Sequence, residues 1–480
     1  MHSPDRDLSV SRRRFLQSMG SAVGAGLLVS PLIDQTAAAA ARPAYPVLRQ
    51  TRPRPTPAQL AWQQDEVALF VHFGVNTFTD REWGDGRESP ALFNPARLDA
   101  RQWARAAKSA GAKAMVLTAK HHDGFCLWPT RTTRHSVASS PWRGGRGDVV
   151  REFVDACRAE GLKAGLYCSP WDRNHPTYGD SARYNDVYIE QLTELLTQYG
   201  PLNEVWFDGA NGEGPNGKRQ VYDWPRTWAL VRKLQPNAVM FSDAGPDVRW
   251  IGNERGVAGE TCWSTIRSTS VPYIGASGDD VIASLQHGHE DGDVWRPGET
   301  DVSIRPGWFH HAAEDAKVRS VDNLVELYFT SVGRNSKLLL NVPPTRDGRF
   351  HDTDVARLAG MRAALDAMYA AQVRGTTDWK ATDARTGVLT MSVPTTARDT
   401  GAPITVIELA EPIVDGQIVR RWRVRAHAHD GPVVAEGTTI GYQQLRRIQP
   451  TSAVRFVLEV ECNDAVRPVS MRLYSARSGA

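Results

Sequence analysis

Short apolar runs alternate with segments of helical periodicity between residues 69 and 371, and this alternation restricts the possible folds more than any other feature. Six runs predict strands clearly, at 68–75, 113–120, 163–170, 203–208, 237–243 and 336–344, and two weaker runs lie near 261–266 and 293–295. Eight strands that alternate with helices over about 300 residues predict an α/β fold, a TIM-like (β/α)8 barrel.

The segments between these runs carry the periodicity of amphipathic helices. The first predicted helix, 98–111, has Asp99 as its start signal and Gly111 as its stop signal. Further helices are expected at 147–162, 182–199, 322–332 and 354–371, with one more entered at residues 223–225. A doubly wound open sheet is the alternative arrangement, but no glycine fingerprint follows the first strand, so the barrel is favoured.

The chain changes character after Thr376, where strand patterns follow one another without helices between them. These patterns lie at 387–393, 404–412, 418–428, 431–441, 453–462 and 469–475. They predict a C-terminal antiparallel β-sandwich over residues 376–480, after a catalytic (β/α)8-like barrel at 42–375. A structural buttress is the favoured role for the sandwich, and an independent sugar-binding module is the alternative.

The first 41 residues have the composition of an export signal. Arginines 13 and 14 precede Phe15 and Leu16, a weakly apolar stretch covers 21–33, and small residues follow near 39–41. This order is typical of a twin-arginine signal peptide, whose receptor belongs to the export machinery for folded proteins. An uncleaved membrane anchor is disfavoured because the apolar stretch is short. We therefore expect a periplasmic or secreted protein.

Composition excludes several classes of function. The net charge of +3 arises from 57 basic and 54 acidic residues, which does not predict a nucleic-acid partner or a polybasic membrane surface. Five cysteines, an odd number without C-x-x-C spacing, indicate buried thiols rather than a disulfide framework or a zinc site. They are Cys126, Cys157, Cys168, Cys262 and Cys462. No cofactor is predicted.

Polar and aromatic residues lie near the ends of the first four predicted strands or directly after them. These residues are His72, Glu82, Trp83, His121, His122, Asp123, Tyr167, Trp171, Asp172, Trp206 and Asp208. Strand ends of a barrel converge on the mouth of the active site, so these side chains are expected to meet there. Hydrogen-bonding groups together with aromatic rings suit a carbohydrate, which offers hydroxyl groups and C–H faces.

Several of these residues have alternative roles. His72, inside a strand, could be a satisfied core histidine. His121 and His122 suggest metal ligands, but adjacent side chains on an extended backbone point in opposite directions, and no acidic cluster completes a metal site. Asp123 precedes glycine and is expected in a turn, while Asp172 could cap a helix. No metal site is predicted.

Asp208 is the strongest candidate for a reacting group. An apolar strand leads to it, and glycine follows it in "EVWFDGANG". Glycoside cleavage usually needs two carboxyl groups, one that attacks or activates water and one that exchanges a proton. The second carboxyl group has five candidates between which spacing alone does not decide: Asp243, Glu254, Glu260, Glu299 and Asp301.

Eight ordered motifs resemble the α-L-fucosidases of glycoside hydrolase family 29. They are "LFVHFGVNTF", "REWGDG", "AKHHDGFCLWPT", "GLYCSPWDRNHPTYG", "EVWFDGANG", "WIGNERG", "RPGWF" and "LLLNVPP", within residues 55–375. The resemblance extends into the sandwich through "AEGTTIGYQQLRRI". It implies a (β/α)8-like barrel and cleavage of α-L-fucosidic bonds with retention of configuration, on fucosylated oligosaccharides or glycoconjugates.

The resemblance also implies roles for individual residues. Asp208 matches the nucleophile of "WFDG", and Glu254 of "GNE" matches the acid/base of the branch that prefers α-1,3 and α-1,4 linkages. The implied fucose pocket consists of His72, Glu82, Trp83, His121, His122, Tyr167, Trp206 and Trp308. His310 departs from the family pattern, where a tyrosine is expected, and Cys168 after Tyr167 is a tolerated departure. The alternatives are a glycosidase for α-L-galactose and a silent fucose-binding protein.

Overall fold

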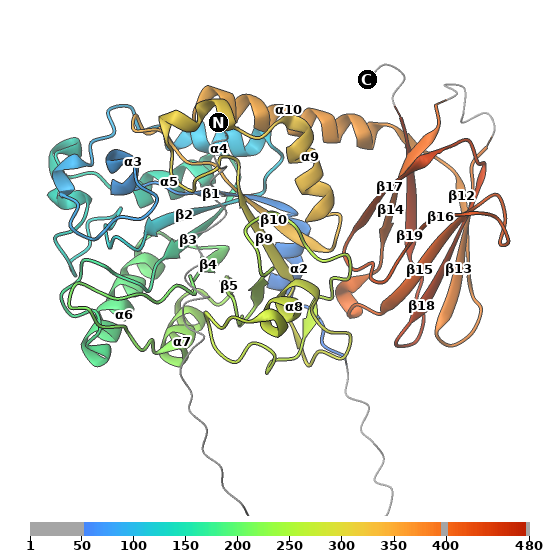
Figure 1. Cartoon of the computed structure of the whole chain (residues 1–480), viewed down its shortest axis with the longest axis horizontal. Coiled ribbons are helices and arrows are strands. Elements are labelled where there is room, and N and C mark those ends of the chain that lie inside the picture. The colour runs from blue at the N-terminus through green and yellow to red at the C-terminus, as the bar shows by residue number, and fades with distance from the viewer. Residues whose placement is uncertain (1–51, 395–401, 477–480) are drawn as a thin grey trace, which may run out of the picture.

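The computed structural model describes residues 52–394 and 402–476 (Figure 1). The expected signal peptide at 1–41 lies outside the described residues. Two bodies follow one another along the chain, a barrel surrounded by helices and a pair of antiparallel sheets beside it (Figure 1). Among the described residues, we find no helix with the length and apolar character needed to cross a bilayer.

Eight parallel strands close into a barrel, which confirms the predicted fold class. They are β1 (Val67–Val71), β2 (Ala114–Lys120), β3 (Lys163–Cys168), β4 (Glu204–Trp206), β5 (Val239–Ser242), β6 (Val248–Trp250), β9 (Gly298–Ser303) and β10 (Ser336–Asn341). Hydrogen bonds connect them in the order β1-β10-β9-β6-β5-β4-β3-β2. The pairing of β1 with β10, where Leu69 lies opposite Leu340, joins the first strand to the last.

The two weaker strand predictions were wrong as barrel strands. The segments near 261–266 and 293–295 form β7 (Thr265–Ile266) and β8 (Val294–Trp295), which pair antiparallel in a separate small sheet. Their places in the barrel belong to β6 and β9. Strand β6 has three residues, and β9 has the largely polar sequence GETDVS, which is nevertheless fully buried. Neither strand has the apolar run by which a buried strand is recognised.

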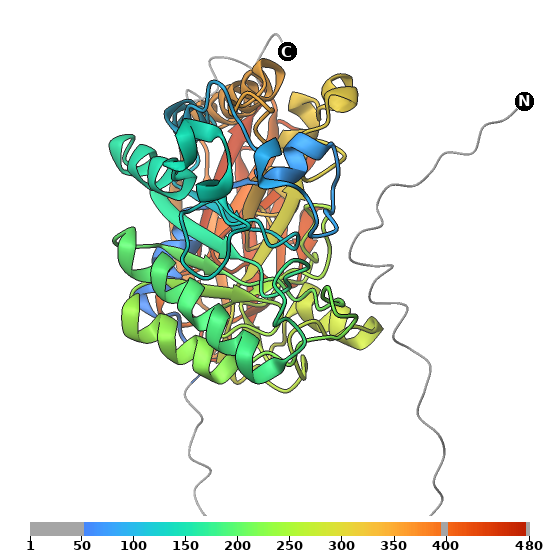
Figure 2. The ribbon, with the colours of Figure 1, turned by 90° about the vertical axis from the view of Figure 1, so that its left-hand side faces the viewer.

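Helices cover the outside of the barrel (Figure 2). The helices of the described residues are α2 (Pro57–Gln64), α3 (Val75–Thr79), α4 (Ala100–Ser109), α5 (Val149–Ala159), α6 (Ser181–Gln198), α7 (Trp224–Leu234), α8 (Asp279–His287), α9 (Val321–Thr330) and α10 (Asp352–Ala370). Short 3-10 turns occur at Pro90–Leu92, Val137–Ser139, Trp142–Gly145, Ala312–Lys317 and Ile413–Asp415. Asp99, as expected, caps α4 by accepting a hydrogen bond from the backbone of Gln102.

Alternate residues of the strands face two different cores. Leu69 and Val71 of β1 pack outward into the layer between barrel and helices, whereas Ala68 and Phe70 pack into the barrel interior. This is the period of two that a strand imposes on its side chains. The inward-facing residues continue to the carboxyl ends of the strands. Aromatic residues of the barrel interior, such as Phe70, therefore form the base of a cavity at that end.

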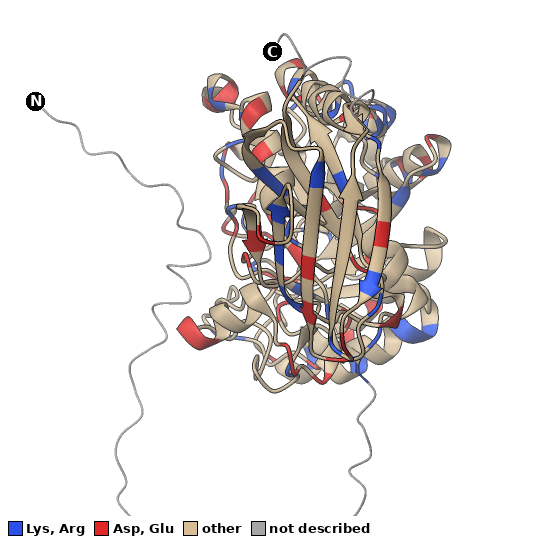
Figure 3. Cartoon of the chain, turned by 90° about the vertical axis from the view of Figure 1, so that its right-hand side faces the viewer, with Lys and Arg blue, Asp and Glu red and all other residues tan. Residues whose placement is uncertain are grey.

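The C-terminal sheets confirm the predicted antiparallel sandwich. One sheet has the order β11 (Gln372–Val373), β19 (Ser470–Ser475), β14 (Ile404–Ala410), β17 (Gln444–Thr451). The other has the order β12 (Thr376–Ala381), β13 (Thr386–Ser392), β18 (Arg455–Cys462), β15 (Val419–Ala426), β16 (Val433–Gly437). A core that includes Leu389, Trp422 and Leu458 lies between them, and acidic and basic residues are interspersed on the outer face (Figure 3).

Hydrogen bonds connect the sandwich to the barrel. The side chain of Asn335, next to β10, donates to the carbonyl oxygen of Cys262 across 2.8 Å and accepts from the backbone of Tyr442 across 2.7 Å. Glu66, next to β1, accepts from the hydroxyl group of Tyr442 across 3.0 Å. The sandwich thus contacts the residues that precede two barrel strands. All five cysteines are buried free thiols, as predicted.

Candidate active site

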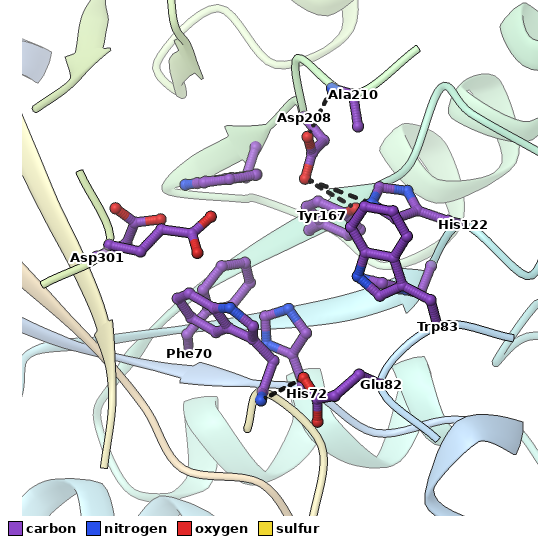
Figure 4. Close-up of a pocket in the computed structure, with 13 residues that line it drawn as sticks. Phe70, His72, Glu82, Trp83, His122, Tyr167, Asp208, Ala210 and Asp301 are labelled. Atoms are coloured by element: carbon purple, nitrogen blue, oxygen red, sulfur yellow. Dashed lines mark hydrogen bonds and ion pairs between the residues drawn. The ribbon is translucent and has the colours of Figure 1, made fainter. Parts of the chain in front are cut away.

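A pocket opens at the carboxyl ends of the barrel strands (Figure 4). Its lining consists of Phe70, His72, Glu82, Trp83, His121, His122, Tyr167, Trp206, Asp208, Ala210, Glu254, Asp301 and Trp308. All ten predicted site residues are in this set, although they are distributed over more than 230 positions of the sequence. Each lining residue comes from the barrel part of the chain, and none comes from the described part of the sandwich.

Asp208 presents one carboxylate oxygen to a turn and the other to the pocket. Oδ1 accepts a hydrogen bond from the backbone of Ala210 across 2.8 Å. Oδ2 accepts from the hydroxyl group of Tyr167 across 3.3 Å and lies 3.9 Å from Nε2 of His122. Gly209 is required in this turn because a Cβ atom there would collide with the carboxylate of Asp243. The turn-forming and the pocket-facing role therefore belong to different oxygens of one side chain.

Both members of the histidine pair line the pocket, which corrects the expectation that they point in opposite directions. That expectation holds on an extended backbone, but β2 ends at Lys120, so both histidines belong to the following loop. The ring centroids of His121 and His122 lie 4.2 Å apart. His122 is fixed by a 2.8 Å hydrogen bond between Nδ1 and the hydroxyl group of Ser169.

Burial keeps two of the pocket histidines uncharged. It lowers the pKa of His72 to about 4, and together with the nearby His122 it lowers the pKa of His121 well below its usual value. Nδ1 of His72 lies 2.8 Å from the side-chain oxygen of Asn341, whereas the buried Nδ1 of His121 has no hydrogen-bond partner among the described residues. Neutral imidazoles that can donate and accept hydrogen bonds suit hydroxyl groups of a sugar.

Aromatic rings form the base and the walls of the pocket. Trp206 stacks on Phe241 with ring centroids 4.1 Å apart and planes 9° apart, and it contacts Phe70 with centroids 5.2 Å apart. Trp308 lies against His72 on one wall, with centroids 5.1 Å apart. Trp83 lies edge-on to His122 on another wall, with centroids 5.6 Å apart. The pocket therefore offers apolar faces beside polar groups.

Glu82 holds the loop that carries Trp308. Its carboxylate accepts from the backbone of Trp308 across 2.7 Å and from the backbone of Phe309 across 3.0 Å. It also contacts Nε2 of His311 across 2.7 Å, and this hydrogen bond, with that to Asp80, raises the pKa of His311 to about 9. His310, the residue that departs from the family pattern, lies outside the pocket, and its Nε2 contacts Asp315 across 3.2 Å.

The structure separates the five candidates for a second carboxyl group. Glu254 and Asp301 line the pocket, and Oδ1 of Asp301 accepts a hydrogen bond from the indole of Trp250 across 2.7 Å. The other three lie outside the lining. Asp243 accepts from the backbone of Gly275 across 3.1 Å, Glu260 forms surface ion pairs, and Glu299 is buried inside the barrel.

Sequence reasoning did not place Phe70, Ala210 and Asp301 in the pocket. Phe70 is two positions before His72 and so on the same inward face of the strand, and the period of two was a signal for it. Asp301 was named only as a possible second carboxyl group, because the strand that carries it was predicted at 293–295 instead of 298–303. Ala210 lines the pocket because its backbone closes the turn at Asp208, and the sequence gives no separate signal for it.

Asp123 and Asp172 have structural roles outside the pocket lining. Asp123 forms the predicted turn, because its Oδ1 accepts from the backbone of Phe125 across 2.7 Å. Asp172 does not cap a helix. Its Oδ1 accepts from the backbone of Asn174 and His175, and its Oδ2 forms a buried ion pair with Lys120 at 3.2 Å. The nearest following helix, α6, begins nine positions later at Ser181.

A closed parallel barrel whose mouth combines carboxyl groups, neutral histidines and indole rings defines an enzyme of the carbohydrate-hydrolysing class. Within the described residues, no group of three or more histidine, cysteine or acidic residues is arranged to hold a metal ion. The sequence model of the family "Alpha-L-fucosidase" matches residues 71–368. The chain therefore belongs to the α-L-fucosidase family, glycoside hydrolase family 29.

Individual relatives agree with this membership. A rice protein (Oryza sativa subsp. japonica) provisionally named alpha-L-fucosidase 1 is 45% identical over 452 residues, which cover 89% of this chain and 85% of the relative. A glycoside hydrolase 29 family member from a rumen bacterium is 38% identical with a TM-score of 0.79, covering 90% of this chain and 79% of that one. A Ruminococcus gnavus GH29 fucosidase in complex with fucose is 29% identical with a TM-score of 0.77, covering 88% and 95%.

Proposed function

We propose that the protein is a retaining exo-acting α-L-fucosidase that releases α-1,3- or α-1,4-linked fucose from oligosaccharides or glycoconjugates. The observation that carries this proposal is the position of Asp208, whose Oδ2 faces the pocket beside Tyr167 and His122 while Oδ1 is held by the chain. A carboxylate fixed in this way is suited to attack the anomeric carbon of a sugar that lies on Trp206.

In the first step, Asp208 attacks the anomeric carbon and Glu254 donates its proton to the glycosidic oxygen. The bond from the anomeric carbon to that oxygen breaks, a bond to the Asp208 carboxylate forms, and the acceptor sugar leaves as an alcohol. The hydroxyl group of Tyr167 donates to the attacking carboxylate before the reaction, which keeps it oriented. Glu254 is partly exposed, which suits an acid that protonates a leaving sugar on the solvent side of the pocket.

In the second step, Glu254 removes a proton from water, and the water oxygen attacks the anomeric carbon. The bond to Asp208 breaks, and fucose is released with its original anomeric configuration. Glu254 is again protonated and Asp208 is again a carboxylate, so both groups return to their initial states. Retention follows from two inversions at the same carbon.

The character of the pocket supports fucose as the bound sugar. Fucose carries a methyl group where galactose has a hydroxymethyl group, and the aromatic faces of Phe70, Trp206 and Trp308 provide apolar contacts for it. The neutral rings of His72 and His121 provide partners for the ring hydroxyl groups. The linkage preference is supported by "TFTDREWGDG" and "IRPGWF", which resemble the α-1,3/1,4 branch of the family.

The reaction is tested with Asp208→Gly on an aryl α-L-fucoside. We expect nearly complete loss of turnover, with partial recovery in azide, because a small anion can enter the vacated space and give a fucosyl azide of inverted configuration. Asp223→Gly is a matched control, since Asp223 also accepts a backbone hydrogen bond but lies at the start of α7. Wild-type turnover in Asp208→Gly would remove Asp208 from the mechanism.

The substrate is tested by product analysis on α-1,2-, α-1,3-, α-1,4- and α-1,6-linked fucosyl oligosaccharides, with an aryl α-L-galactoside for comparison. We expect fucose release mainly from the α-1,3 and α-1,4 linkages. Faster cleavage of the galactoside would make α-L-galactose the sugar, and binding of fucose without cleavage of any substrate would make the protein a sugar-binding protein.

We also propose export to the periplasm or the medium through the twin-arginine machinery. The support is the sequence pattern around arginines 13 and 14. Replacement of both by lysine should retain the protein in the cytoplasm, as measured by fractionation of cells. Unchanged export of that variant would contradict this route.

A further inference from the structure

A group of buried charged side chains lies inside the barrel beneath the pocket. Glu204 of β4, Glu299 of β9 and Lys337 of β10 are each fully buried. Nζ of Lys337 lies 3.2 Å from Oε2 of Glu204 and 3.7 Å from Oε2 of Glu299. Oε2 of Glu204 also accepts from the indole of Trp62 across 2.9 Å. We call these three residues the interior triad.

The interior triad touches the pocket through one hydrogen bond. The indole nitrogen of Trp206 donates to Oε1 of Glu299 across 3.0 Å. The face of the same indole is stacked on Phe241, so the ring is held at its face by packing and at its edge by Glu299. Glu299 itself does not line the pocket. Its effect on a bound sugar must therefore pass through Trp206.

Charge balance in the triad explains which form of Glu299 accepts this hydrogen bond. Two carboxyl groups surround one ammonium group in the described surroundings, so full ionisation would leave a buried negative charge that is costly. Burial and the neighbouring Glu204 raise the pKa of Glu299 well above its usual value. A neutral Glu299 removes the excess charge, and its carbonyl oxygen still accepts from the indole.

We propose that Glu299 is a positioning residue for the sugar site: it fixes the ring of Trp206, and thereby the platform on which the fucosyl group rests. This inference depends on the proposed function, because it takes Trp206 as a sugar contact. Without the hydrogen bond, the indole can rotate on Phe241, and its buried N–H group lacks an acceptor. The expected consequence is weaker sugar binding with little change in the chemical step.

The experiment compares Glu299→Leu with Glu194→Leu. Glu194 is a matched control, because it is also buried and its Oε2 accepts a hydrogen bond from the indole of Trp128 across 2.7 Å. Neither Glu194 nor Trp128 lines the pocket. We expect Glu299→Leu to raise KM for an aryl α-L-fucoside, and the calorimetric Kd for L-fucose, by about ten-fold, with kcat changed much less. Glu194→Leu should lower the unfolding temperature without changing KM.

A double-mutant cycle tests whether Trp206 transmits the effect. Trp206→Phe removes the N–H donor, so Glu299→Leu should raise KM no further in that background. Should Glu299→Leu fail to fold, Glu299→Gln and Glu299→Asp replace it. Gln keeps an acceptor at the same reach and should leave KM within about two-fold of the wild type, whereas the shorter Asp should raise it.

Three results would overturn the inference. The first is an equal KM for Glu299→Leu and Glu194→Leu. The second is an equal increase of KM by Glu299→Leu in the wild type and in Trp206→Phe. The third is an equal KM for Glu299→Gln and Glu299→Asp. A wild-type protein without activity on the aryl fucoside would instead contradict the proposed function itself. The two failures are thus distinguished by the wild-type measurement.

Discussion

The hydroxyl group of Tyr167 donates a hydrogen bond to Oδ2 of Asp208 across 3.3 Å, so a residue of β3 orients the candidate nucleophile that follows β4. This contact joins neighbouring strands of the barrel, in which Tyr167 pairs with Trp206 two positions before Asp208. The pairing fixes where the hydroxyl group and the carboxylate meet. It gives the first prediction.

We expect Tyr167→Phe to lower kcat on an aryl α-L-fucoside by about 10- to 100-fold, since one hydrogen bond to a charged group contributes roughly 1.5–3 kcal/mol. The ring remains, so KM and the unfolding temperature should change little. Tyr188→Phe is the control, because its hydroxyl group donates to the backbone oxygen of Cys168 and not to Asp208. An equal effect of both variants on kcat would show that the contact with Asp208 is not used.

The second prediction separates the two remaining candidates for the acid/base. Glu254→Ala should lower kcat/KM at least 100-fold on an oligosaccharide but much less on a fucoside with an activated leaving group, which needs no protonation. Asp301→Ala should affect both substrates by a similar factor, because Asp301 is held by Trp250 in the barrel wall.

Glu260→Ala is the control for this comparison, because the exposed Glu260 pairs with Arg334 and Arg446 outside the pocket. It should behave as the wild type on both substrates. A dependence on the leaving group in Asp301→Ala, and none in Glu254→Ala, would transfer the role to Asp301.

The third prediction concerns pH. The pKa of His311 is raised to about 9 by its hydrogen bonds to Glu82 and Asp80, so the charged ring stabilises the folded protein. This stabilisation is fully present below the ordinary histidine pKa of about 6.5 and is lost as pH rises through about 9. His311→Gln should therefore lower the unfolding temperature more at pH 6 than at pH 10.

KM provides a second measure of the same contact. Because Glu82 holds the backbone of Trp308, loosening at high pH should raise KM of the wild type above about pH 9. In His311→Gln this rise should be smaller. A constant difference in unfolding temperature between pH 6 and pH 10 would contradict the assignment of the pKa to this contact.

The fourth prediction concerns the buried ion pair behind the histidine loop. Nζ of Lys120 contacts Asp172 across 3.2 Å, Tyr184 across 3.0 Å and Gln191 across 2.8 Å, and none of these groups is exposed. Lys120→Met leaves the carboxylate of Asp172 without its counter-charge, which should cost about 3–5 kcal/mol of unfolding free energy in urea.

The exposed Lys108 provides the control for that measurement. It lies 3.8 Å from Glu160 on the surface, where an ion pair contributes about 0–1 kcal/mol. Lys108→Met should therefore change the unfolding free energy little. A loss in Lys120→Met no larger than in Lys108→Met would show that the buried pair does not contribute.

Local pattern was sufficient for the elements that have a strong apolar signal. Strands β1 to β5 and β10 were predicted because continuous apolar runs are needed where a strand is buried on both faces. Strands β6 and β9 were missed because β6 is very short and β9 carries Glu299 and Asp301 into the barrel. Buried polar residues are tolerated there because Trp206, Trp250 and Lys337 supply their partners.

The sequence by itself determined the alternation that specifies a barrel, the change to an all-β segment, and Asp208 at the end of an apolar strand. Only the tertiary structure decided which other groups share its pocket. It brought Glu254 and Asp301 there, left Glu260 on the surface and placed Glu299 beneath Trp206. The physical reason is that closure of the barrel joins residues distant in the chain, and the distances that result depend on strand register, which no short stretch of sequence encodes.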